Sequence, residues 1–162
     1  MDAYNHLDSV KLYDNISEDD DYETVVKKVF QSCIRDLEDT LNILEINEYK
    51  RAVEAIMKAE RIVLCGTGDA ANVARFGFQK FIRIGKNVHV AEDTDLQLIT
   101  ASHLKEGDVL IVISHSGRTK SIVELVKYIK NKGPTIICIT NFPLSPLAKN
   151  SDIILLTAAF AE

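Results

Sequence analysis

A chain of 162 residues, of which 46% are hydrophobic and 27% are charged, has the length and composition of one water-soluble globular domain. The formal net charge of −5 argues against a stand-alone nucleic-acid binder, and no apolar run approaches the roughly 20 residues of a membrane span. We therefore expect a cytoplasmic protein that has no membrane partner and makes no DNA contacts of its own.

The N-terminal part of the chain is polar at first and then becomes amphipathic. Residues 1–22 contain the acidic run EDDD and show no sustained periodicity, so we interpret them as a flexible lead-in or linker. From residue 23 to about 46, apolar residues recur every three or four positions, which predicts a long helix with the stripe Phe30, Ile34, Leu37, Leu41 and Leu44. Packing of this stripe on its own domain and a dimer seam fit the pattern equally well; its length leads us to expect a homodimer.

A second helix is predicted at about 47–59, which completes a helical region over 23–59, and an α/β core is predicted over 60–162. Short aliphatic runs predict strands near 61–65, 87–91, 108–113, 134–140 and 152–156. Helical periodicity between them predicts helices near 72–85, 96–104 and 119–131, and we expect the first of these to face the core with Val73, Phe76, Phe81 and Ile84. Alternating strands and helices predict a three-layer α/β/α sandwich with a five-stranded parallel sheet in the flavodoxin-like order 2-1-3-4-5, preceded by two helices.

The sequence gives no sign of a metal or a nucleotide cofactor. Cys33, Cys65 and Cys138 are odd in number, widely spaced and set among aliphatic residues, which indicates buried reduced thiols. The GTG that begins at Gly66 lacks the third glycine of the dinucleotide fingerprint, and the chain has no phosphate-binding loop of the GxxxxGK[ST] type. We therefore expect neither a metal nor a cofactor.

The segment SHSGRT (114–119) joins a predicted strand to the start of a predicted helix. Free N–H groups and the positive end of the helix dipole favour an anion there, and Ser114, Ser116 and Thr119 offer hydroxyl donors. The alternative is that Ser116 or Thr119 only caps the helix. The segment GTGDAA follows the neighbouring strand, so the two turns are expected to flank the point where strand order reverses.

Three segments, LCGTGDAANVARFGFQKFIRIGKNV, DVLIVISHSGRTKSIVE and ITNFPLSPLAKNSDIILLT, resemble in order and spacing the sugar isomerase (SIS) domain. They look most like the phosphosugar-sensing C-terminal domain of RpiR-type transcriptional regulators, and the resemblance runs from about residue 19 to the C-terminus. It implies a bound sugar phosphate whose phosphate is held by Ser114, Ser116 and Thr119, with residues 66–68 closing the other side. The implied ligand-binding set is Gly66, Thr67, Gly68, Ser114, His115, Ser116, Gly117, Thr119 and Glu162.

The chain departs from the family pattern in three places. The first turn often carries a serine where this chain has Ala70, and Asp69 would repel a phosphate unless Arg118 or another cation compensates. No helix-turn-helix fits within residues 1–22, so we expect DNA contact only through such a domain outside this chain. The chain also stops just after the last predicted strand, where relatives continue into a helix, so we expect an excised or truncated effector domain.

Two functional classes follow from the resemblance: a sensor that binds a sugar phosphate and an aldose–ketose isomerase that converts one. Isomerisation needs a positioned acid and base, for which the sequence offers Glu162, His115 and Glu92 but no evident pair. We therefore predict a sensor without a catalytic residue, with the isomerase as the alternative. A third possibility, a scaffold that has lost its ligand, is suggested by Asp69 and Ala70.

Overall fold

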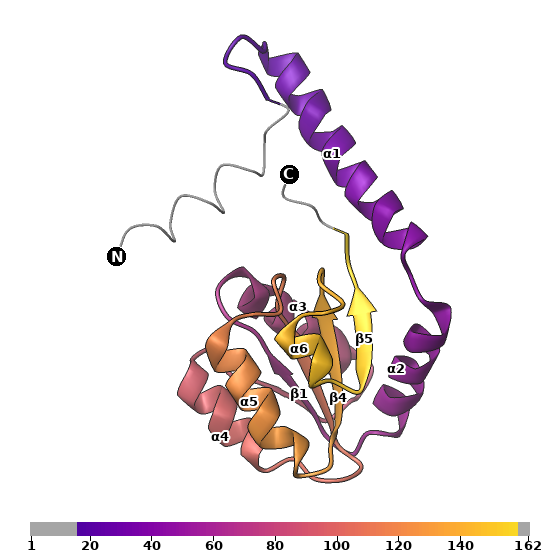
Figure 1. The fold of residues 1–162 in the computed structure, drawn as a ribbon, viewed down its shortest axis with the longest axis vertical. Coiled ribbons are helices and arrows are strands. Elements are labelled where there is room, and N and C mark those ends of the chain that lie inside the picture. Colours follow the sequence, from indigo (N-terminus) through magenta and orange to yellow (C-terminus); the bar gives the residue numbers. More distant parts are fainter. Residues whose placement is uncertain (1–15, 159–162) are drawn as a thin grey trace. The chain divides into compact units, whose positions relative to one another are not determined.

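The computed structural model describes residues 16–158, so the predictions for residues 1–15 and for Glu162 lie outside the described residues. The chain forms two compact units. Of the described residues, 16–44 together with 157 and 158 belong to the first, and 45–156 form the second. The second unit contains both turns singled out above (Figure 1).

Helix α1 (Tyr22–Asn42) of the first unit begins directly after the acidic run, whose last residue, Asp21, is its N-cap. The carboxylate of Asp21 accepts a hydrogen bond from the Thr24 N–H at 2.8 Å and so caps the helix. Asp20 accepts from the Lys28 ammonium at 2.6 Å, and this hydrogen bond, followed by that from the Ser17 N–H, holds the pKa of Asp20 below its ordinary value. Two of the four acidic residues therefore organise the helix start. At the other end the helix stops at Asn42, short of the predicted residue 46.

No residue of α1 is buried. Phe30, Leu37 and Leu41 of the apolar stripe are 67%, 72% and 69% exposed. Cys33 on the same helix is exposed as well, so the prediction of a buried thiol is wrong for Cys33. The aliphatic neighbours that suggested burial belong to the stripe itself, and the large side chains of the stripe on α1 are exposed in the described residues.

The second unit begins with α2 (Ile46–Lys58) and then alternates strands and helices, as predicted. The elements are β1 (Ile62–Cys65), α3 (Asp69–Arg83), β2 (Val88–Val90), α4 (Thr94–Ser102), β3 (Val109–Ile113), α5 (Lys120–Lys130), β4 (Thr135–Thr140), α6 (Pro146–Lys149) and β5 (Ile153–Leu156). All neighbouring strands pair in parallel, in the order β2-β1-β3-β4-β5. The fold class and the strand order are therefore confirmed.

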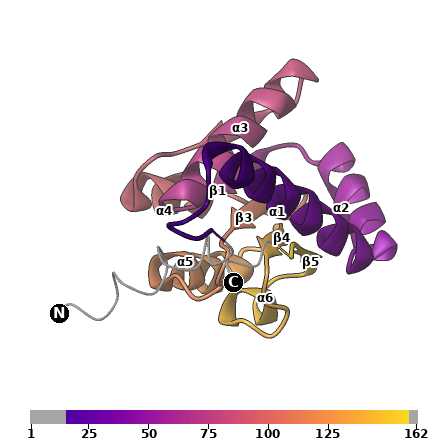
Figure 2. The same ribbon diagram turned by 90° about the horizontal axis from the view of Figure 1, so that it is seen from above.

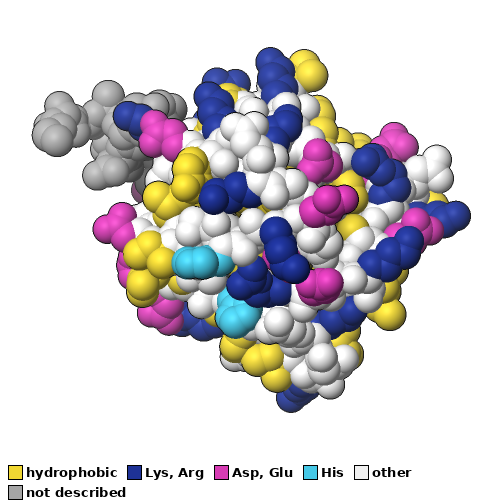
Figure 3. Space-filling model, turned by 90° about the horizontal axis from the view of Figure 1, so that it is seen from below, with side chains coloured by type: hydrophobic (Ala, Val, Ile, Leu, Met, Phe, Trp, Pro, Cys, Tyr) yellow, Lys and Arg dark blue, Asp and Glu magenta, His cyan; other side chains and the backbone are white. Residues whose placement is uncertain are grey.

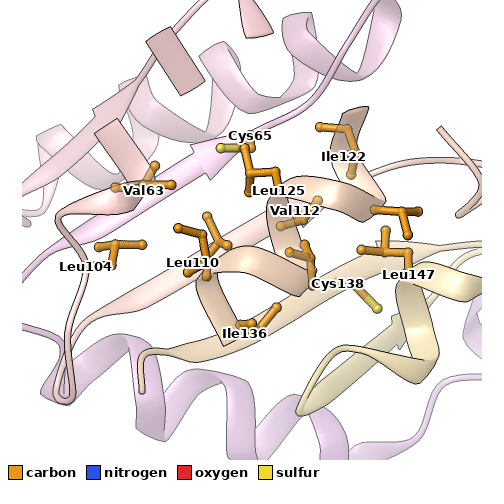
Figure 4. Packing of buried hydrophobic residues seen from close by; sticks show 14 of the residues in the cluster. Val63, Cys65, Leu104, Leu110, Val112, Ile122, Leu125, Ile136, Cys138 and Leu147 are labelled. Carbon is orange, nitrogen blue, oxygen red and sulfur yellow. The ribbon is translucent and has the colours of Figure 1, made fainter. Parts of the chain in front are cut away.

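Each face of the sheet carries its own hydrophobic core. Helices α5 and α6 lie on one side and α2 and α3 on the other (Figure 2). Figure 4 shows the first core, in which Cys65 and Cys138 pack among leucine, isoleucine and valine side chains. Burial raises the pKa of the Cys65 thiol to about 12, so it stays protonated at neutral pH. For these two cysteines the predicted buried thiol is confirmed.

The face that α3 turns toward the sheet differs from the prediction. Ala74 is buried, and Ala70, Phe78 and Phe81 pack around the same core, whereas Val73, Phe76 and Ile84 are 52%, 58% and 66% exposed. Positions 70, 74, 78 and 81 follow the helical spacing of one face, so two alanines and two phenylalanines pack on the strands, while Val73 and Phe76 line an apolar cavity beside them. Of the four residues expected to face the core, only Phe81 does so.

Strand pairing brings the two candidate turns to one edge of the sheet. Cys65, the last residue of β1, pairs with Val112 of β3, and Val112 pairs in turn with Cys138 of β4. Gly66 therefore stands level with Ile113, one residue before the SHSGRT turn begins. Since the chain reverses its direction of strand addition between β1 and β3, this edge is where parallel sheets bind their ligands.

Two observations bear on the partners that the sequence excluded. Among residues 16–158 no helix is both long and apolar enough to cross a membrane. On the face seen from below, basic and acidic side chains lie side by side over the right and central parts, and several basic ones gather in the upper part (Figure 3).

Candidate anion-binding site

The turn after β3 is held by buried polar groups. Ser114 is buried, and its N–H donates to the Ile139 C=O at 3.0 Å, which extends the pairing with β4 beyond the strand end. Its hydroxyl lies 3.3 Å from the hydroxyl of Thr119. Two of the predicted donors are therefore in contact with each other at the start of α5.

Gly117 is fixed by its conformation and by its surroundings. Its φ of +60° lies in the left-handed region that favours glycine, and a Cβ there would lie 2.2 Å from Ser145 Oγ. The Gly117 C=O accepts a hydrogen bond from the Leu147 N–H at 3.0 Å. Ser145 and Thr140, both buried, thus support the turn. Neither residue was predicted from its own pattern, although both lie in the segment ITNFPLSPLAKNSDIILLT that carries part of the family resemblance.

The capping alternative can be tested against the hydrogen bonds. Thr119 occupies the N-cap position of α5, yet its side chain makes no capping hydrogen bond. Ser116 Oγ accepts from the Arg118 N–H at 3.2 Å, before the helix begins. Val123 donates to the Thr119 C=O, so the N–H groups of residues 120–122 precede the first intrahelical bond. Neither hydroxyl caps the helix. Ser116 Oγ accepts in its one hydrogen bond within residues 16–158 and keeps its O–H for a ligand, whereas the Thr119 hydroxyl shares a hydrogen bond with that of Ser114.

Charge distinguishes the two helix N-termini at this edge of the sheet. The first turn of α3 contains Asp69, whose carboxylate lies at the positive end of its own helix dipole. The first turn of α5 contains no acidic residue and includes Lys120, and Arg118 is exposed beside it. An anion is therefore favoured at α5, while the exposed Asp69 makes α3 the weaker end.

The turn after β1 is built from glycine backbone. A Cβ on Gly66 would lie 2.7 Å from the backbone C and O of Ala70, and Gly68 has a φ of +60° and serves as the N-cap of α3. Thr67 between them is half-buried. Because the turn has no large side chain, the backbone of residues 66–68 can approach a ligand closely.

Within residues 16–158, the candidate acid–base residues His115 and Glu92 make separate contacts. The exposed His115 packs its ring against the edge of Phe142, with centroids 6.0 Å apart, and within residues 16–158 its imidazole makes no hydrogen bond. Glu92 forms a surface ion pair with Arg75 at 3.1 Å. Glu162 lies outside the described residues. In the described part of the chain no three His, Cys, Asp or Glu side chains gather as metal ligands.

Comparison with known proteins assigns the chain to a family. The model of the SIS domain matches residues 55–162, which is more than half of the sequence. The chain belongs to the SIS domain family. A Thermotoga maritima protein described as an uncharacterized HTH-type transcriptional regulator is 36% identical over 146 residues, covering 90% of this chain and 52% of that protein. Regulators named RpiR and HexR also match, and the SIS chain spans about half the length of these curated relatives.

Solved structures of SIS-domain proteins agree with this assignment. The Vibrio vulnificus NanR protein complexed with ManNAc-6P superposes with a TM-score of 0.80 and 30% identity, covering 83% of this chain and 51% of NanR. The sugar isomerase domain of an RpiR transcription factor from Sphaerobacter thermophilus gives a TM-score of 0.77 at 28% identity, covering 82% and 75%. A Methanococcus jannaschii protein with an inferred 3-hexulose-6-phosphate isomerase function gives 0.59 at 25%, covering 68% and 59%. The SIS fold therefore serves both regulators and proteins described as enzymes.

Proposed function

We propose that this SIS domain is the effector domain of a transcriptional regulator and binds a sugar phosphate at the carboxyl ends of β1 and β3. The observation that carries the proposal is the N-terminus of α5, where neither Ser116 nor Thr119 caps the helix, the Ser116 O–H is free to donate, and the first turn holds no acidic residue. The matched NanR structure, which contains a sugar phosphate, supports the ligand class. DNA contact falls to a helix-turn-helix domain outside this chain, and the regulator acts in the cytoplasm.

In this proposal the phosphate accepts hydrogen bonds from Ser114, Ser116 and Thr119 and from the free N–H groups at the start of α5. Gly117 allows close approach, His115 covers the turn, and residues 66–68 bound the sugar on the other side. Charge-assisted hydrogen bonds of this kind are about twice as strong as neutral ones. Arg118 and Lys120 add positive charge that offsets the exposed Asp69.

We propose further that the domain binds its ligand without converting it. Moving a proton between C1 and C2 requires an acid and a base within hydrogen-bond reach of the sugar. Glu92 is held in an ion pair with Arg75, and the His115 ring lies against Phe142. These arrangements favour a binding module over the isomerase alternative.

A thermal-shift experiment tests the binding site. A sugar phosphate at about 100 times its dissociation constant should stabilise the domain by about 2.7 kcal/mol, a rise of several degrees in Tm. Ser116→Ala removes a hydrogen bond to a charged ligand and should weaken binding by about tenfold or more. Ser102→Ala, which removes a hydroxyl bonded to the Ile99 C=O at the C-terminus of α4, is the control and should leave the shift intact. An undiminished shift in Ser116→Ala would place the phosphate elsewhere.

We also propose a homodimer, because the stripe on α1 exposes large apolar side chains over most of the helix. Sedimentation at tens of micromolar, an order-of-magnitude working range, should show a dimer. Leu37→Glu places a charge in the middle of the stripe and should give a monomer, whereas Glu38→Lys on the same helix should not. A wild-type monomer at these concentrations would contradict the proposal.

A further inference from the structure

A buried glutamine joins the ends of β1 and β2 beneath the site. Gln97 of α4 is fully buried, and its Nε2 donates to the Gly66 C=O at 2.7 Å and to the Ala91 C=O at 3.1 Å. Gly66 directly follows β1, and Ala91 directly follows β2. Since both partners are acceptors, the amide orientation is fixed with its nitrogen toward the two carbonyls.

The other half of this amide is unsatisfied. Gln97 Oε1 is buried and has no hydrogen-bond partner within the described residues. A buried acceptor without a partner lowers the free energy of unfolding, but the Nε2 of the same amide satisfies two backbone carbonyls. The amide therefore acts on the backbone at the ends of β1 and β2 rather than only filling space.

The hydrogen bond to Gly66 determines the direction of the next N–H group. Among the described residues no peptide bond is cis, and in a planar trans peptide the C=O and N–H groups point in opposite directions. The Gly66 C=O points at the buried Gln97, so the Thr67 N–H points away from α4. No acceptor within residues 16–158 pairs with the Thr67 N–H. The close approach of Gly66 to Ala70 leaves the peptide little room to turn.

We infer that Gln97 is a positioning residue that aims the Thr67 N–H at the ligand anion. The inference rests on the proposed sugar-phosphate site and adds a donor from β1 to those of the α5 turn. Gln97 never contacts the ligand; it acts through the Gly66–Thr67 peptide. Gln97 therefore affects only the turn after β1. Its role can be tested separately from that of Ser116, which lies in the turn after β3.

The test is a titration of the ¹⁵N-labelled chain with inorganic phosphate, followed by amide chemical shifts. In the wild type, both the Thr67 amide and the amides of residues 116–121 should shift. In Gln97→Met, which keeps the volume and removes the donor, the Thr67 response should disappear and affinity should fall about tenfold or more, while residues 116–121 still respond. Asn87→Leu is the matched control, because it removes an amide-to-carbonyl bond to Glu60 at the opposite edge of the sheet.

The outcomes separate this inference from the proposed function. An unchanged Thr67 response and affinity in Gln97→Met would overturn the inference and leave the proposed site standing. The wild type alone can also overturn the inference, whether or not the variants fold. If its amides of residues 116–121 shift on phosphate addition but the Thr67 amide does not, the inference is wrong and the proposed site stands. A wild type in which neither turn responds would overturn both. Gln97→Glu, which replaces the donor by an acceptor in the same shape, should reproduce the loss seen with methionine.

Discussion

Replacing Gly117 with alanine should lower the free energy of unfolding by about 2–5 kcal/mol and abolish sugar-phosphate binding. Two effects add. An alanine at a φ of +60° costs about 1–2 kcal/mol, and the new Cβ would lie 2.2 Å from Ser145 Oγ and 2.5 Å from Ser145 Cβ, an overlap that costs about 1–3 kcal/mol. To relieve the overlap the turn must move off α6, which displaces Ser116 and Thr119 together.

Urea unfolding and a ligand titration measure the two consequences. The control is Gly85→Ala, because Gly85 has a φ of +76° but nothing within 4 Å of its would-be Cβ. It should lose only the conformational part, about 1–2 kcal/mol, and bind normally. Equal losses in the two variants would show that the contact with Ser145 does not constrain the turn.

Gly66→Ala should disrupt the turn after β1. The added Cβ would lie 2.7 Å from both the C and the O of Ala70, which are backbone atoms and can move only if α3 moves. We expect a loss of about 1–3 kcal/mol in the free energy of unfolding. Binding should weaken as well, because the Gly66–Thr67 peptide must turn away from Gln97.

Gly77→Ala, in the helix that follows this turn, provides the matched comparison. Its Cβ would lie 2.9 Å from Leu64 Cδ2, the end of a flexible side chain, and alanine favours the helix over glycine. The two effects oppose each other, so the free energy of unfolding should change by less than about 1 kcal/mol, and binding should be retained. A Gly77→Ala variant as damaged as Gly66→Ala would contradict the explanation from backbone contact.

Much of the fold was predictable because the pattern is local. Aliphatic runs such as DVLIVI are buried on both faces of a parallel sheet, and glycines and hydroxyl residues mark where those strands end. The turn at 114–119 was recognisable because it places three hydroxyl residues at the start of a helix. Strand order then followed from the parallel βαβ connections and the family resemblance.

The parts that were not predictable depend on contacts between distant segments. In the sequence, nothing distinguishes Gln97 from an ordinary polar residue on the surface of a helix. Only the fold brings its amide to the carbonyls of Gly66 and Ala91. Ser145 supports Gly117 from α6, 28 positions along the chain. The predicted orientation of α3 was also wrong, because Val73 and Phe76 are more hydrophobic than Ala70 and Ala74, which face the sheet.

The central claim, binding without turnover, is tested most directly by incubating the protein with aldose and ketose 6-phosphates in deuterated water. Deuterium at C2 is followed by NMR, and the thermal shift of the same samples reports binding. We predict that a sugar phosphate that raises Tm incorporates no deuterium beyond the buffer control. Protein-dependent exchange that disappears in His115→Asn or Glu162→Gln would contradict the sensor and establish the isomerase.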